Sequence, residues 1–131
     1  PGAVTLRIDV GSQIPISVTS MGRALLSALP EDERNFLMEH IRKKCADAKE
    51  YEKIKQGVDK AIDDIRTRGF SMSLGEWRSE VNAVGVPLIA RDDRIFALNC
   101  GGPAFRVSKE YLEEECGPRL VELARKISAL S

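Results

Sequence analysis

The chain has 131 residues, 43% of them hydrophobic, and its 20 basic and 20 acidic residues give a formal net charge of zero. A chain of this length forms one domain with one core. The balanced charge argues against binding nucleic acid by phosphate neutralisation, which needs a basic face. No apolar run approaches the roughly 20 residues of a membrane span, so we expect no membrane partner.

The cysteines and the N-terminal residues indicate in which cellular compartment the protein is expected. Cys45, Cys100 and Cys116 are an odd number without C-x-x-C spacing, so we expect neither a disulfide framework nor a zinc site. No export leader precedes the first strand-like residues. We therefore expect a cytoplasmic protein with reduced thiols. The abrupt start at Pro1 suggests a domain, residues 1–131, that lacks its own first segment.

The first third of the chain is predicted to hold two strands and two helices. Val4–Val10 alternates apolar and polar residues as a half-buried strand does, and Ile14–Val18 is apolar and β-prone. A helix follows over Ser20–Leu29, opened by the hydroxyl of Thr19 or Ser20. Pro30 and the three acids after it open a second helix that runs to about residue 44.

Periodicity within these helices indicates their buried faces. In the second helix Phe36, Leu37 and Ile41 are expected to face inward, and residues 46–50 are expected to form a polar linker. A third helix carries its apolar stripe from Ile54 to Ile65 and ends at Gly69.

The remaining elements are a strand, a hairpin and a helix. Phe70–Leu74 is predicted as a strand, and Val81–Ala90 with Arg94–Cys100 as a hairpin. A loop is expected over Gly101–Pro103. Ser108 is expected to cap a final helix, which Pro118 should kink or restart. Without regular βαβ alternation, this order indicates an α+β fold with a largely antiparallel sheet.

The helix start near Ser20 is a candidate anion site. A helix N-terminus presents N–H groups without intrahelical partners and the positive end of the helix dipole. Gly22 in the first turn adds no bulk, and hydroxyl groups stand beside it. Such an end can receive a carboxylate or a phosphate.

The hairpin has a face of small residues. Side chains alternate across a strand, so Ala83 and Gly85 share a face on one strand, and Ala97, Asn99 and Gly101 on the other. If the two sets lie on the same face of the hairpin, their small side chains leave space above the sheet. Protein interiors are closely packed and do not leave such a space empty. Either a helix packs closely there or a ligand fills the space, and the inward Asn99 favours the ligand slightly.

The chain is poor in catalytic candidates. His40 is the only histidine and is expected to face solvent, and Cys100 has no identifiable histidine partner. Glu76 and Glu80 could form an acid pair, but a solvated edge or a subunit contact is the favoured interpretation. Trp77 could lie at a pocket lid, at an interface or in the core. We expect no catalytic residues, no metal and no cofactor.

Four sequence blocks together resemble a known family. They are S-M-G-R-A-L-L-S-A-L-P-E-D-E-R at residues 20–34, R-G-F-S-M-S-L-G-E at 68–76, A-V-G-V-P-L-I at 83–89 and N-C-G-G-P-A-F-R at 99–106. Their order and spacing resemble the C-terminal effector-binding domain of IclR-type bacterial transcriptional regulators. The resemblance implies a GAF-like fold that senses small organic acids, with DNA binding by a separate N-terminal winged helix-turn-helix and assembly into dimers or tetramers.

The resemblance also implies a ligand pocket between the helix start and the sheet. The matching positions are Ala3, Ser20, Met21, Ser73, Val81, Ala83, Asn99 and Gly101. Gly22 and Ala97 join these candidates from the patterns above. This sequence departs from the family pattern at three of these positions: Ser73 replaces an acid, and Asn99 and Gly101 replace hydroxyl residues. The polar side chains at the sheet side of the pocket therefore differ from those usual in the family.

The sequence therefore predicts a ligand-sensing domain that binds a small organic acid. Two alternatives stay open. One is an oligomerisation domain without a ligand, and the other is a small enzyme that uses Cys100 or Glu76.

Overall fold

A computed structural model describes residues 15–130 of the chain. The predicted strand Val4–Val10 and the candidate Ala3 lie outside the described residues. The elements are α1 (Ser20–Ala28), α2 (Glu31–Lys44), α3 (Ala48–Arg68), β1 (Ser71–Leu74), β2 (Val81–Ile89), β3 (Ile95–Pro103), α4 (Lys109–Tyr111), the π-helical turn η1 (Leu112–Cys116) and α5 (Gly117–Leu130).

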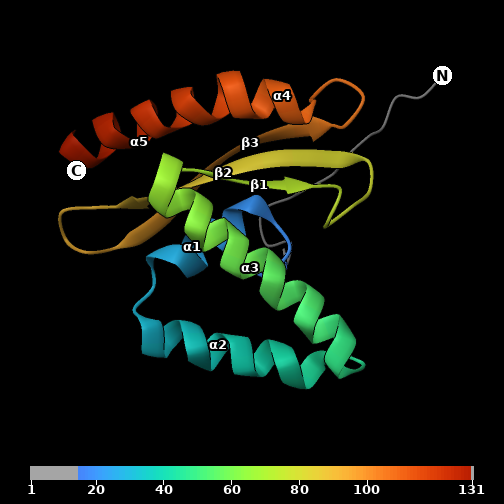
Figure 1. The fold of residues 1–131 in the computed structure, drawn as a ribbon. Coiled ribbons are helices and arrows are strands. Elements are labelled where there is room, and N and C mark those ends of the chain that lie inside the picture. The colour runs from blue at the N-terminus through green and yellow to red at the C-terminus, as the bar shows by residue number, and fades with distance from the viewer. Residues whose placement is uncertain (1–14, 131) are drawn as a thin grey trace.

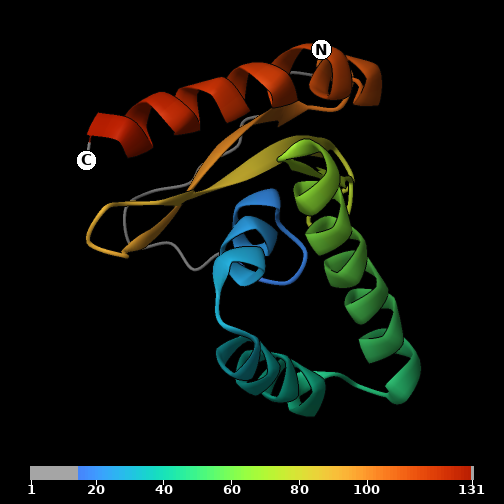
Figure 2. The ribbon, with the colours of Figure 1, turned by 60° about the vertical axis from the view of Figure 1, so that its left-hand side comes forward.

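The described elements form three layers around an antiparallel sheet of order β1-β2-β3. Helices α4 and α5 cover one face of the sheet, and α1 with α3 covers the other (Figure 1). Helix α2 lies beyond α1 and α3, away from the sheet (Figure 2). The predicted α+β class with an antiparallel sheet is confirmed. None of the helices within residues 15–130 has the length and apolar character that a membrane crossing requires.

Helix ends follow the capping signals of the sequence. The Gly22 N–H donates to the hydroxyl of Thr19 at 3.1 Å, which makes Thr19 the cap of α1. Gly69 ends α3 with a left-handed φ of 89°. The linker predicted for residues 46–50 is wrong from Ala48 onward, because Asp47 caps α3 there and accepts the Glu50 N–H at 2.8 Å.

The extended segment predicted for Ile14–Val18 is wrong over its described part, where residues 16–18 form a turn. Side chains bind the carbonyl groups of Pro15 and Val18 in this part of the chain. Thr19 Oγ1 donates to the Pro15 carbonyl and Ser73 Oγ donates to the Val18 carbonyl, each at 2.7 Å. These bonds fold the chain back into the start of α1.

The loop predicted for Gly101–Pro103 is also wrong, since these residues complete β3. Val81 stands opposite Pro103 and Ala83 opposite Gly101 in the ladder. The missing N–H of Pro103 is tolerated because it is the last residue of the strand.

Two apolar clusters hold the layers together. The first, between the sheet and α5, centres on buried Phe70, Val84 and Leu112. The second joins α1, α2 and α3 around Leu26, Met38 and Val58.

The expected inward position of Phe36 is wrong. This side chain is 66% exposed, and its ring meets the His40 ring edge-on at 4.6 Å. Met38 is the residue that α2 buries. Leu37 and Ile41 are partly buried and pack against the second cluster as predicted, so α2 contacts it through Leu37, Met38 and Ile41 rather than through Phe36.

The final helix restarts where proline predicts. Ser108 caps α4, and the helix continues as the wider π-helical turn η1. At the end of this turn, the Gly117 N–H donates a hydrogen bond to the Leu112 carbonyl. Pro118 has no N–H to continue the regular ladder. A Cβ on Gly117 would lie 2.6 Å from the Phe70 ring, so only glycine permits this close approach.

Candidate ligand-binding site

A cavity of about 220 Å³ lies between the N-terminus of α1 and the β2–β3 face of the sheet. Its lining combines hydroxyl groups, small floor residues and two large side chains. The lining residues are Thr19, Ser20, Met21, Ser73, Trp77, Val81, Ala83, Asn99, Gly101 and Gly102. The cavity brings together seven of the predicted site residues, which are far apart in the sequence: Ser20, Met21, Ser73, Val81, Ala83, Asn99 and Gly101. Their role in binding a ligand stays a prediction.

The ladder register brings the two small faces together. Ala83 stands opposite Gly101 and Gly85 opposite Asn99. A Cβ on Gly85 would lie 2.3 Å from the Ser20 carbonyl oxygen, so α1 packs closely on the sheet at that point. Beside it, the floor at Ala83 and Gly101 lines the cavity. Close helix packing and a ligand-sized space, predicted as alternatives, therefore occur next to each other on one face.

Gly22 and Ala97 are not among the described residues that line this cavity. A Cβ on Gly22 would lie 2.2 Å from the Ile16 carbonyl oxygen, so this glycine allows the preceding turn to pack against α1. Its N–H is bonded to Thr19. Ala97 stands opposite Pro87, farther along the hairpin.

Three lining residues were not among the sequence candidates. Thr19 was identified only as a possible cap, and Gly102 was assigned to a loop. Trp77, for which a pocket lid was one of three alternatives, lies at the cavity. Side-chain alternation along β3 does not predict that Gly102 lies on the cavity face. Trp77 reaches the cavity because of where the segment between β1 and β2 lies, which no local pattern indicates.

A buried arginine holds the segment that carries Trp77. Arg23 is 3% exposed, and its Nη1 and Nη2 atoms donate to the two carboxylate oxygens of Glu76 at 2.7 and 2.8 Å. Its Nε donates to the Ser17 carbonyl at 3.0 Å. The pair joins α1 to the residue next to Trp77, and sequence patterns gave no signal for it.

The electrostatics of this ion pair follow from its partial burial. Burial would raise the pKa of the Glu76 carboxyl, but the hydrogen bonds and charge of Arg23 outweigh that effect, and the pKa is lowered. Gly57 in α3 makes room for the arginine, because a Cβ there would lie 2.3 Å from Arg23 Nη2.

Among residues 15–130, the side chains that line this cavity are all uncharged. Within this described lining, the N-terminal turn of α1, at Ser20 and Met21, offers positive potential to an anion. The Ser73 hydroxyl donates to the Val18 carbonyl, so its remaining capacity toward a ligand is as an acceptor. Asn99 is exposed and supplies an amide at the floor.

The side chains weighed for catalysis lie apart from this cavity. Cys100 does not line it and lies 4.0 Å, sulfur to sulfur, from Cys116 of the opposite helical layer. Glu76 is bonded to Arg23 rather than to Glu80. His40 lies on α2, beside Phe36.

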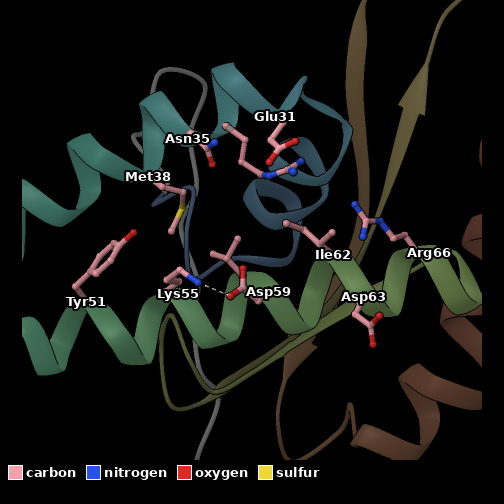
Figure 3. A pocket seen from close by; sticks show the side chains of 11 residues that line it. Glu31, Asn35, Met38, Tyr51, Lys55, Asp59, Ile62, Asp63 and Arg66 are labelled. Atoms are coloured by element: carbon pink, nitrogen blue, oxygen red, sulfur yellow. Dashed lines mark hydrogen bonds and ion pairs between the residues drawn. The ribbon is translucent and has the colours of Figure 1, made fainter.

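A larger cleft of about 420 Å³ separates α2 from α3 (Figure 3). Apolar Met38, Val58 and Ile62 contribute to its lining alongside acidic and basic side chains. Its charges are partly engaged with one another, as in the 2.8 Å pair between Lys55 Nζ and Asp59 Oδ2. The cavity at the sheet combines an apolar floor with converging polar groups, which is typical of small-molecule sites.

Known proteins are similar to this chain in sequence and in fold. The family model described as the bacterial transcriptional regulator IclR C-terminal matches residues 1–129. The structure of an IclR family transcriptional regulator from Brucella abortus is 42% identical, with a TM-score of 0.88 over 99% of this chain and 48% of that one. The Pca operon regulatory protein of Acinetobacter baylyi is 26% identical over 92% of this chain and 43% of its own length.

A third likeness concerns the fold. The inducer-binding domain of the PobR transcription factor from Acinetobacter, a double mutant in complex with 3-hydroxybenzoic acid, is 24% identical with a TM-score of 0.68, over 90% of this chain and 67% of that one. The chain spans less than half the length of the curated relatives it matches. The family match covers nearly all of the sequence, and the chain therefore belongs to the C-terminal domain family of the IclR bacterial transcriptional regulators.

Proposed function

We propose that this chain is the sensing domain of a bacterial transcriptional regulator and binds a small organic acid in the cavity between α1 and the sheet. The observation that carries the proposal is the cavity lining, which places the N-terminal turn of α1 opposite an apolar floor of small residues. A volume of about 220 Å³ is below the roughly 300–1,000 Å³ of drug-sized pockets, so a small aliphatic acid or a single aromatic ring fits best.

Each part of such a ligand has a matching surface. The carboxylate is received at the N–H groups of Ser20 and Met21, where the helix dipole favours a negative charge. The body lies over Val81, Ala83 and Gly101, and Trp77 closes one side. The bound 3-hydroxybenzoic acid of the PobR domain supports an aromatic acid as the first compound to test.

Binding would act on a larger assembly. A ligand shifts an equilibrium between two arrangements only by its differential affinity for them. The ion pair between Arg23 and Glu76 links α1 to the residue next to Trp77, which lines the cavity. A ligand in the cavity therefore contacts Trp77 and α1, two parts of the structure that this ion pair connects. We propose that the regulator acts in the cytoplasm as a homodimer or tetramer, with DNA bound by a separate domain and no catalysis in this one.

The test is thermal unfolding of the chain with a panel of acids: 3-hydroxybenzoate, benzoate, succinate and pyruvate, with methyl 3-hydroxybenzoate as the uncharged control. An acid at 100 times its Kd stabilises the folded state by about 2.7 kcal/mol, a shift of several degrees. The ester should shift the melting temperature much less, because the α1 N-terminus then receives no charge. Equal shifts by acid and ester would contradict the carboxylate position.

A matched pair of variants tests the cavity itself. Val81→Trp fills the cavity and should abolish the shift, whereas Ile89→Trp on the same strand, at a 49% exposed position, should keep it. A shift that persists in Val81→Trp would overturn the site. No shift with any acid in the panel, together with an oligomer in light scattering, would favour an assembly domain instead.

A further inference from the structure

Two cysteines that do not line the sensing cavity lie in contact. Cys100 on β3 and Cys116 at the end of η1 have their sulfur atoms 4.0 Å apart. Cys100 is exposed and Cys116 is half-buried, and both thiols are free. The third cysteine, Cys45, ends α2 in another layer of the molecule, and its thiol donates to the Ile41 carbonyl at 3.2 Å.

Strand alternation explains the position of Cys100. Asn99 and Gly101 line the cavity on one face of β3, so Cys100 between them projects to the opposite face. Its ladder partner Val84 belongs to the cluster beneath α5, and Cys116 packs against that same cluster. The two thiols therefore meet between the sheet and the helical layer.

The π-helical turn explains the position of Cys116. The turn inserts an extra residue ahead of Pro118, and Gly117 lies directly against the Phe70 ring. This close approach brings the end of η1 down onto the sheet. Tyr111 precedes η1, and hydrogen bonding with Cys116 raises the pKa of its phenol.

We propose that Cys100 and Cys116 form an oxidant-responsive dithiol that closes to a disulfide when the protein meets a hydroperoxide. The Cys100 thiolate attacks one peroxide oxygen, the O–O bond breaks, and the departing oxygen takes a proton to leave as water or an alcohol. The resulting Cys100 sulfenic acid is then attacked by Cys116, which forms the S–S bond and releases water. The two thiols lose two electrons in total and the hydroperoxide gains them.

The geometry requires a modest closure. Van der Waals contact at 4.0 Å must shorten to a bond of about 2.05 Å, which side-chain rotation and a small shift of η1 can supply. Burial, with the neighbouring Cys116, raises the pKa of the Cys100 thiol, so little thiolate exists at neutral pH. The pair should therefore respond slowly, to a high oxidant level, rather than turn over as a peroxidase.

The disulfide would tie the strand that carries Asn99 and Gly101 to the helical layer behind it. It closes a loop between positions 16 residues apart, which restricts the unfolded chain. Oxidation should raise the melting temperature by roughly 5–10 °C, and dithiothreitol should reverse the change.

The experiment treats the whole reduced chain with hydrogen peroxide at pH 8, blocks remaining thiols with iodoacetamide, and maps the peptides by mass spectrometry. The expected product is a monomer that has lost two hydrogen atoms and gained one carbamidomethyl group, with a Cys100–Cys116 peptide pair and Cys45 alkylated. The C45S variant should behave identically. In C116S a sulfenic acid at Cys100 should be trapped by dimedone, and C100S should form no intramolecular disulfide.

Three results would overturn the proposal, and the first two need no variant to fold. One is full alkylation of Cys100 and Cys116 after peroxide treatment. Another is a disulfide that involves Cys45 or joins two chains. The third is an identical intramolecular product in C100S. The acid-binding panel is independent of these readouts, so failure of either proposal leaves the other testable.

Discussion

Arg23 places a positive charge in the interior of the molecule, and two neighbours make that possible. Glu76 binds both of its terminal nitrogens, and the Ser17 carbonyl accepts its Nε. Taking a charge out of water costs several kcal/mol unless it is paired and hydrogen-bonded. The arrangement therefore depends on Glu76, although 41% of that side chain is exposed.

Glu76→Gln should lower the free energy of unfolding by about 1–3 kcal/mol in urea titrations, less than the 3–5 kcal/mol of a fully buried pair because water screens Glu76. Glu39→Gln is the control: it removes the acid of the exposed Arg42–Glu39 pair, and no measurable loss is expected. Equal effects of the two substitutions would contradict a special role for Arg23.

The same pair sets a dependence on pH. Because the pKa of Glu76 in the folded state lies below its ordinary value of 4.5, the ion pair stabilises fully above that value. Its contribution is lost as pH falls through the folded-state pKa. The stability difference between the native chain and Glu76→Gln should therefore be constant at neutral pH and shrink below about pH 4.5. A difference that grows on acidification would contradict this.

At the scale of elements, α3 shows packing overriding helix propensity. Gly57 lies inside this helix, where glycine costs about 1 kcal/mol relative to alanine. Sequence reasoning alone therefore expects Gly57→Ala to stabilise the protein. In the structure the new Cβ would meet Arg23 Nη2 at 2.3 Å, and three hydrogen bonds prevent the guanidinium from moving aside.

Gly57→Ala should thus destabilise the chain by about 1–3 kcal/mol, the usual cost of overpacking. Gln56→Ala, at the neighbouring exposed position, should stay within about 0.5 kcal/mol of the native chain. Chemical denaturation of both variants measures the comparison. A stabilised Gly57→Ala would mean that Arg23 is not held where the structure places it.

At the scale of the whole molecule, stability is unevenly distributed. The cluster beneath α5 includes Val84, Val86 and Leu88 from β2, whereas α2 contributes one buried residue, Met38, to the second cluster. An element with little buried apolar surface opens at lower free energy than a central strand. Helix α2 also forms one wall of the cleft between α2 and α3, so we expect it to open more readily than β2.

Hydrogen exchange should resolve this difference. Amides of α2 are expected to exchange at least about tenfold faster than those of β2, because local opening of α2 leaves the sheet cluster intact. Mass spectrometry of peptides from the two segments gives the rates. Equal protection would show instead that both clusters unfold as one cooperative unit.

The sequence by itself determined the local features of this protein. Capping at Thr19, the end of α3 at Gly69 and the restart at Pro118 follow from the chemistry of single residues. Alternation also predicted the small faces that meet in the hairpin, because side-chain direction along a strand has a fixed period.

Only the tertiary structure decided which of these features meet. The turn before α1, the ion pair between Arg23 and Glu76, and the contact between Cys100 and Cys116 join residues across elements. Trp77 reaches the cavity for the same reason. Such contacts depend on how the layers pack and on which buried polar groups find partners. The periodicity of the sequence within one helix or strand contains no information about either.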